Sequence, residues 1–162
     1  MLAQIQLQRC SSAINALIAS GMNIKFIPLA ISQIAHETAG FTSNVANTCN
    51  NLSGIKFINN QQKQKATKCT GSPEGNNYAK YANYNDWAAD YIRILNIGVK
   101  PINSNSIQEF AEKLKQNAYY TDTTSNYIKG LNYWLKQFDQ IIQEEIKKKN
   151  YPKPNIQFSR SF

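Results

Sequence analysis

The residue best suited to acid chemistry is a glutamate at the end of an apolar stretch. Glu37 lies three residues after Ile34 and seven after Ala30, so a helix places these side chains on one face. Apolar surroundings and the negative end of a helix dipole both disfavour the carboxylate anion, and therefore raise its pKa. A glutamic acid that keeps its proton near neutral pH can act as a general acid. Taken alone, the pattern also fits a solvated glutamate at a helix end.

Neither the histidine nor the cysteines indicate a metal site. His36, the only histidine, points about 100° away from Glu37 on a helix, which favours packing or a rim position over catalysis. Cys10, Cys49 and Cys69 lack the Cys-x-x-Cys spacing of zinc sites, and a Cys–His nucleophilic pair would have to use His36. Free thiols and a Cys49–Cys69 disulfide across the middle of the chain remain alternatives. We predict no metal and no cofactor.

Hydrophobic periodicity and end signals predict helices on both sides of an irregular middle segment. A first helix from Leu2 ends at Gly21, and a second begins near Pro28, whose missing N–H suits a first turn, and ends at Gly40. Three later helices are expected. Asn85 caps the first of them, and the capping box Ser106 to Glu109 opens the second. The last begins at Thr124 or Ser125, carries an apolar stripe to Ile142, and has Lys147 to Lys149 near its C-terminus.

The middle segment, residues 41–85, is rich in Asn, Gln, Lys, Thr and Gly and contains the turn signal Gly71-Ser72-Pro73-Glu74-Gly75. The stretches 65–70 and 78–81 lie on either side of this turn and can pair as a hairpin. The sequence therefore predicts a mainly α protein with a small β-like insertion between the second and third helices.

The charge and hydropathy of the chain limit the classes of partner. The formal net charge of +8 favours contact with polyanions, including nucleic acid, anionic lipid and anionic wall polymer. Only Arg9, Arg93 and Arg160 are arginines, which argues against nucleic acid, because arginine is the preferred reader of phosphate and guanine. No apolar run approaches the roughly 20 residues that cross a bilayer. The first residues lack the continuous apolar core of a secretory signal, so another delivery route is expected.

Three motifs in order carry a resemblance to a known family. Ala35-His36-Glu37-Thr38 is followed by Asn50-Asn51-Leu52-Ser53-Gly54-Ile55-Lys56, and later by Tyr119-Tyr120-Thr121-Asp122 ahead of Tyr127. The set resembles the autolysin-type endo-β-N-acetylglucosaminidases of glycoside hydrolase family 73 over residues 28–138. The chain departs from the pattern at Ser53, where Phe is usual, and at Thr38-Ala39-Gly40-Phe41, where Ser-Gly-Trp-Gly is usual. The stretch around Glu37 also looks like the catalytic helix of some plant-type chitinases.

The resemblance implies a lysozyme-like α+β fold over residues 1–142, with a β-hairpin lobe at about 56–84 above a glycan cleft. Residues 143–162 would form a basic tail containing prolines. Glu37 would be the catalytic acid, and Tyr119 would be the active-site tyrosine that contacts the substrate or the developing positive charge. The expected substrate-binding residues are Phe41, Asn51, Gly54, Ile55, Tyr84 and Tyr127.

The second catalytic group is left open by the sequence. Glycoside hydrolysis commonly uses two carboxylates. Glu74 in the hairpin turn is the candidate for the second one, although a solvated turn residue is an equal interpretation. Asp86 and Asp122 are better explained by helix starts. A further alternative is the substrate's own acetamido group as the nucleophile.

The functional prediction is a peptidoglycan hydrolase that cuts the β-1,4 bond between N-acetylglucosamine and N-acetylmuramic acid, acting as a phage lysin or virion-associated lysin. The alternatives are a muramidase, a lytic transglycosylase, a chitinase-like enzyme, or a non-catalytic wall-binding or virion structural module. The expected partners are peptidoglycan glycan strands, anionic wall polymers and other virion proteins, but not nucleic acid. The protein would act on the wall or outside the cell, released by lysis, carried in a virion, or exported by another route.

Overall fold

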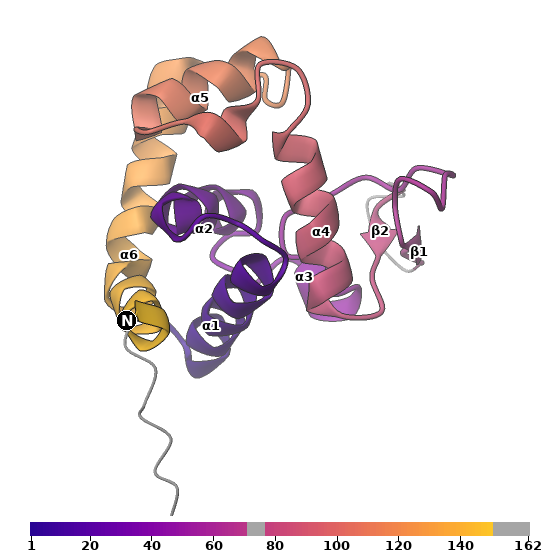
Figure 1. Cartoon of the computed structure of the whole chain (residues 1–162), viewed down its shortest axis with the longest axis horizontal. Helices are drawn as coiled ribbons and strands as arrows, with labels where there is room; N and C mark the ends of the chain where they lie inside the picture. Colours follow the sequence, from indigo (N-terminus) through magenta and orange to yellow (C-terminus); the bar gives the residue numbers. More distant parts are fainter. Residues whose placement is uncertain (71–76, 151–162) are drawn as a thin grey trace, which may run out of the picture.

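The computed structural model describes residues 1–70 and 77–150 and shows a mainly α, lysozyme-like α+β fold with one small antiparallel hairpin (Figure 1). The predicted fold class is confirmed. In chain order the elements are α1 (Gln4–Ala19), the 3-10 turn η1 (Ile24–Phe26), α2 (Ile27–Glu37), α3 (Asn44–Thr48), β1 (Thr67–Lys68), β2 (Ala79–Lys80), α4 (Tyr84–Leu95), the 3-10 turn η2 (Pro101–Asn103), α5 (Ile107–Gln116) and α6 (Thr124–Asn150).

Most of the predicted helix ends are confirmed. α1 ends just before Gly21, whose φ of +93° suits a residue without a side chain, and Pro28 lies in the first turn of α2. The Ser106 side chain caps α5 by accepting from the N–H of Glu109. The predicted cap of α4 is wrong: Asn83, not Asn85, accepts from the N–H of Asp86. The short helix α3 was not predicted.

The second helix is the centre of the core. Most of α2 is buried, from Ile27 to Ala35, and it packs chiefly against α6. Around it, α1 contacts α4 and α6, and α5 contacts α6, as the arrangement in Figure 1 shows. A helix that is apolar on all sides is stable only when neighbours surround it. The last residue of α2, Glu37, is therefore held by the helix at the centre of the core.

The lobe between α3 and α4 is a short hairpin tied to the helical body by a disulfide. Thr67 pairs with Lys80 and Lys68 with Ala79, within the predicted stretches but over a shorter length. Cys49, directly after α3, is bonded to Cys69, directly after β1. Of the two alternatives for these cysteines, the structure shows the disulfide. Cys10 is free and buried, and burial raises the pKa of its thiol, so it is not suited to be a nucleophile.

We expect the disulfide to contribute strongly to stability. Its cysteines are 20 residues apart in the sequence, and closing a loop of this length stabilises a protein by about 3 kcal/mol. The double variant Cys49→Ser, Cys69→Ser should lose about this much in urea unfolding. Wild-type protein under a reductant should behave like the double variant, because buried Cys10 has no disulfide to lose. If the wild-type protein unfolded at the same urea concentration with and without reductant, the expectation would be contradicted.

The C-terminal helix runs past residue 142, where the tail was expected to begin, and reaches Asn150. Residues 143–150 of that segment are therefore helical, and residues 151–162 lie outside the described part of the chain. Within residues 1–70 and 77–150, no helix combines the length and apolar character required to span a bilayer.

Candidate active site

A pocket of about 480 Å³ lies where the end of α2 meets the lobe and α4. It is lined by Glu37, Ser53, Gly54, Ile55, Lys56, Ile58, Tyr78, Arg93, Ile94 and Tyr119. Glu37 is the one acidic residue among the described lining residues. A larger pocket of about 750 Å³, near Asn23 and Ser104, is lined by no acidic residue among those the structure describes. The smaller of these two pockets is therefore the one with the groups for acid chemistry.

Glu37 is positioned by its place at the C-terminal end of α2. The residue is exposed toward the pocket that it lines, and its Oε1 accepts a hydrogen bond from the Tyr127 hydroxyl at 2.8 Å. Burial of the carboxyl raises the pKa of Glu37; the Tyr127 hydrogen bond and the electrostatic effect of His36 lower it, but less than burial raises it. The result is a carboxyl group that holds its proton to higher pH than an ordinary glutamate and still borders open space.

Tyrosines from the loop before α6 and from the first turns of α6 lie near this carboxyl. Tyr127 on α6 is buried, stacks on Tyr120 with ring centroids 3.7 Å apart, and meets His36 edge-on at 4.9 Å. Tyr119 lines the pocket, and burial and the charge of Glu37 raise the pKa of its hydroxyl. Tyr127, expected to bind substrate, thus contacts the acid itself and is not among the residues that line the pocket.

His36 has a packing role in the structure. Its ring lies against Tyr127 and over Gly130, where an added Cβ would collide with the imidazole. This position agrees with the interpretation of His36 as a packing residue. In the described part of the chain, no group of three or more His, Cys, Asp or Glu side chains is arranged to hold a metal ion.

The loop from Asn50 to Lys56 forms one wall of the pocket. Asn51 is fully buried: its Nδ2 donates to the carbonyls of Ile55 (2.8 Å) and Ala79 (2.9 Å), and its Oδ1 accepts from the N–H of Ile55 (2.9 Å). The prediction that Asn51 contacts substrate is therefore corrected: its side chain shapes the loop. Gly54, at φ +67°, and the mostly buried Ile55 do line the pocket.

Ser53, the departure from the family motif, has a partner in the core. Its hydroxyl accepts a hydrogen bond from the indole N–H of Trp87 at 2.9 Å, and both residues are buried. A phenylalanine at this position would leave the indole N–H without that acceptor. The serine is therefore consistent with an intact pocket wall.

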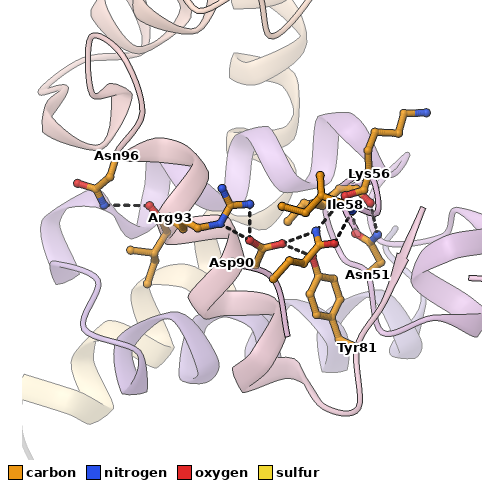
Figure 2. A network of polar contacts seen from close by, with 10 residues as sticks. Asn51, Lys56, Ile58, Tyr81, Asp90, Arg93 and Asn96 are labelled. Atoms are coloured by element: carbon orange, nitrogen blue, oxygen red, sulfur yellow. Dashed lines mark hydrogen bonds and ion pairs between the residues drawn. The ribbon is translucent and has the colours of Figure 1, made fainter. Parts of the chain in front are cut away.

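A buried carboxylate on α4 joins this wall to the helical body (Figure 2). Asp90, 4% exposed, accepts from Tyr81 (2.6 Å), from Gln64 (2.8 Å) and from the guanidinium of Arg93 (2.6 Å). Gln64 in turn donates to the carbonyl of Lys56 at 2.9 Å. Because these bonds cross between α4 and the lobe, they fix the position of both Lys56 and Arg93 at the pocket.

Two more of the predicted site residues, Phe41 and Tyr84, do not line the pocket. Phe41 is fully buried and packs edge-to-face on Phe138 at 5.2 Å, so the prediction that it stacks on a sugar is wrong. Tyr84 is the first residue of α4, is partly buried, and is not among the residues that line the pocket. Glu74 lies outside the described residues. The sequence analysis missed Ile58, Arg93 and Ile94 as pocket residues. The spacing of Asp90 and Arg93 on one helix face was the available signal for Arg93.

We expect Tyr127→Phe to change the pH dependence of the reaction. The variant removes the hydrogen bond that lowers the pKa of Glu37, so that pKa should rise further and the basic limb of the kcat/KM profile should move to higher pH. The rate at the optimum should fall by about tenfold to a hundredfold, because the acid is less well oriented. Tyr133→Phe, an exposed tyrosine on the same helix, is the matched control. A basic limb that stays in place would contradict the assignment.

The fold and this site together define a glycoside hydrolase. The chain belongs to the Glucosaminidase family, described as mannosyl-glycoprotein endo-beta-N-acetylglucosaminidase, whose family model matches residues 11–140. The resemblance to glycoside hydrolase family 73 is thereby confirmed, and with it an endo-β-N-acetylglucosaminidase-like activity. Comparison with curated proteins and with solved structures gives no significant match. Membership implies a peptidoglycan substrate and action on the wall side of the cell.

Proposed function

We propose that the protein hydrolyses the β-1,4 bond between N-acetylglucosamine and N-acetylmuramic acid in peptidoglycan, with Glu37 as the general acid. The observation that carries this proposal is the carboxyl of Glu37, whose pKa is raised by burial and which lines a 480 Å³ pocket. A general acid must hold a proton and reach the leaving oxygen; the raised pKa of Glu37 supports the first condition, and its place in the pocket lining supports the second.

In the proposed mechanism, Glu37 gives its proton to the glycosidic oxygen as the bond breaks. The carboxylate that remains is stabilised by the Tyr127 hydroxyl and by the neighbouring His36 side chain, which both favour the ionised form. Tyr119 lines the same pocket and can contact the sugar on which positive charge develops. Glu37 is the only carboxylate among the described pocket residues. The second catalytic group that glycoside hydrolysis requires is therefore assigned to Glu74 or to the acetamido oxygen of the substrate.

A lysine at the pocket supports a wall substrate over a neutral chitin-like one. Lys56 lines the pocket and makes no ion pair within the described residues, whereas the charge of Arg93 is balanced by Asp90 at 2.6 Å. Peptidoglycan carries carboxylates on its peptide stems, which the Lys56 side chain can attract, whereas chitin has none. This favours cleavage of wall glycan, and we propose anionic wall polymers as a secondary contact of the same face.

Product analysis tests the bond that is cut. Fragments released from purified wall are reduced with borohydride and identified by mass spectrometry. A glucosaminidase gives reduced N-acetylglucosamine ends, a muramidase gives reduced N-acetylmuramic acid ends, and a lytic transglycosylase gives anhydro ends that resist reduction. Reduced N-acetylglucosamine ends are expected, and either other result would overturn the proposed bond. Wall binding without fragments would instead support a non-catalytic module.

We extend the proposal to delivery as a phage lysin or virion-borne lysin, supported by the wall-side substrate of the family. Immunoblots of purified particles and of lysates test it. Detection in particles would indicate a virion-borne enzyme, and detection only after lysis would indicate a lysin. Detection in growing cultures that contain no phage particles and undergo no lysis would overturn the proposal.

A further inference from the structure

Lys115, near the end of α5, contacts the loop that joins α5 to α6. This loop, residues 117–123, carries Tyr119, which lines the pocket, and Tyr120, which stacks on Tyr127. The pocket therefore receives a tyrosine from a segment that belongs to no helix or strand. A loop lacks the regular backbone hydrogen bonds of such elements, so its carbonyl and N–H groups need other partners.

The two ends of the loop are fixed by helix-end chemistry. After α5, Ala118 takes a left-handed φ of +56°, and the N–H of Tyr119 donates to the carbonyl of Leu114 at 2.9 Å. Before α6, the Thr123 hydroxyl accepts from the N–H of Asn126 at 3.2 Å. The three carbonyls between these ends receive no backbone N–H from the part of the chain that the structure describes.

The ammonium of Lys115 is the donor for these three carbonyls. Its Nζ donates to the carbonyl of Asp122 at 2.7 Å, to that of Thr121 at 3.0 Å and to that of Tyr120 at 3.5 Å. An ammonium has three donors and no acceptor, so three converging carbonyls use its full capacity. The same Nζ lies 5.0 Å from the centre of the Tyr120 ring, within range of a cation–π contact.

The charge of Lys115 is directed to backbone and not to a carboxylate. Lys113, two residues earlier on α5, pairs with the Glu109 carboxylate at 2.8 Å, whereas Lys115 forms no such pair within residues 1–70 and 77–150. Hydrogen bonds from a charged donor are stronger than those between neutral groups. The contact of Lys115 therefore determines the shape of the loop.

We propose that Lys115 is a positioning residue for the hydrolase reaction, which gathers the carbonyls of residues 120–122 and so holds the loop in the shape that brings Tyr119 to the pocket. The proposal rests on the proposed function, in which Tyr119 contacts the sugar that is cut. The stack of Tyr120 on Tyr127, with ring centroids 3.7 Å apart, holds the next residue of the loop against α6. A catalytic group displaced by about 1 Å can lower a rate a hundredfold.

Lys115→Met tests the proposal, because methionine keeps an apolar stem and removes all three donors. The kcat for wall cleavage should fall by about tenfold to a hundredfold, with a smaller change in KM, since Tyr119 acts on charge that develops as the bond breaks. Rates are measured well below the melting temperature, so that lost stability alone does not lower them. Lys113→Met, which loses only the pair with Glu109, is the matched control and should keep its kcat. An unchanged kcat in Lys115→Met would overturn the proposal.

A double-mutant cycle separates positioning of the tyrosine from a general effect on the fold. If Lys115 acts through Tyr119, Lys115→Met should lower kcat in wild type and cause little further loss in Tyr119→Ala. The same fold-loss in both backgrounds would overturn the proposal. Lys115→Gln keeps one shorter donor and serves in the same cycle if the methionine variant folds poorly.

Hydrogen exchange measured by NMR gives a readout that needs no substrate. The N–H of Tyr119 should exchange several times faster in Lys115→Met than in wild type, while the N–H of buried Leu131 on α6 should not change. Equal exchange at Tyr119 in the two proteins would overturn the proposal. If wild type released no glycan fragments, the proposed function would fail, and exchange would still show whether Lys115 holds the loop.

Discussion

Replacing Glu37 with glutamine is expected to abolish release of glycan fragments while leaving the fold intact. Glutamine has nearly the same shape, and its amide oxygen can still accept from Tyr127, but it has no proton to give to the leaving oxygen. Loss of a general acid lowers the rate by about a hundredfold to ten-thousandfold. Reducing-end release from purified wall measures the rate, and circular dichroism checks the fold. Full activity in this variant would refute the assignment.

The same substitution should alter how stability depends on pH. Burial holds the pKa of Glu37 above its value in the unfolded chain, so the folded state binds this proton more tightly. The stability from this proton is complete below the unfolded-state pKa and is lost as pH rises through the folded-state pKa. Glu37→Gln has no such loss, so its melting temperature should exceed that of wild type by a margin that grows with pH. Glu112→Gln, an exposed glutamate on α5, is the matched control and should show no such trend.

The largest loss of stability is expected from Asp90→Ala. The substitution leaves the guanidinium of Arg93, the hydroxyl of Tyr81 and the amide of Gln64 without their shared acceptor. Tyr81 and Gln64 are buried, and a buried donor left without its acceptor costs about 1–3 kcal/mol; the lost pair with the partly exposed Arg93 adds to this. Urea unfolding measures the loss. Hydrogen exchange should show faster opening of residues 56–68, and activity should fall as this wall of the pocket loosens.

Asp86→Ala is the matched control for this experiment. Asp86 lies on the same helix, but its partner Lys65 is exposed and 3.5 Å away. Surface pairs of this kind contribute about 1 kcal/mol or less. A loss at Asp90 no larger than the loss at Asp86 would show that the buried network does not anchor the lobe.

The helices were predictable because their ends carry local signals. Gly21, Pro28 and Ser106 each determine a helix end through their own backbone or side-chain chemistry, and the structure confirms all three. The start of α4 was misplaced because Asn83 and Asn85 are equally good caps in isolation, and only the structure shows that Asn83 is the one used. Local chemistry does not contain that information.

The candidate site was predictable only where one helix carries the signal. Glu37 follows from the apolar face of its own helix, whereas its hydrogen-bond partner Tyr127 lies on α6, which no local pattern brings to the end of α2. Asp90 and Arg93 resemble a surface ion pair in the sequence, and only packing against the lobe shows that Asp90 is buried. Phe41 was assigned to the pocket because an aromatic after a helix end can face either core or cleft.

The bond between Cys49 and Cys69 makes the pocket wall sensitive to the redox potential around it. Cellular cytosol keeps thiols reduced, whereas spaces outside it allow them to oxidise. A chain made in the cytosol therefore has a more loosely held lobe than the same chain after it reaches the oxidising side of a membrane. For an enzyme whose family acts on peptidoglycan, this means that the cleft reaches its final rigidity in the compartment where the substrate lies.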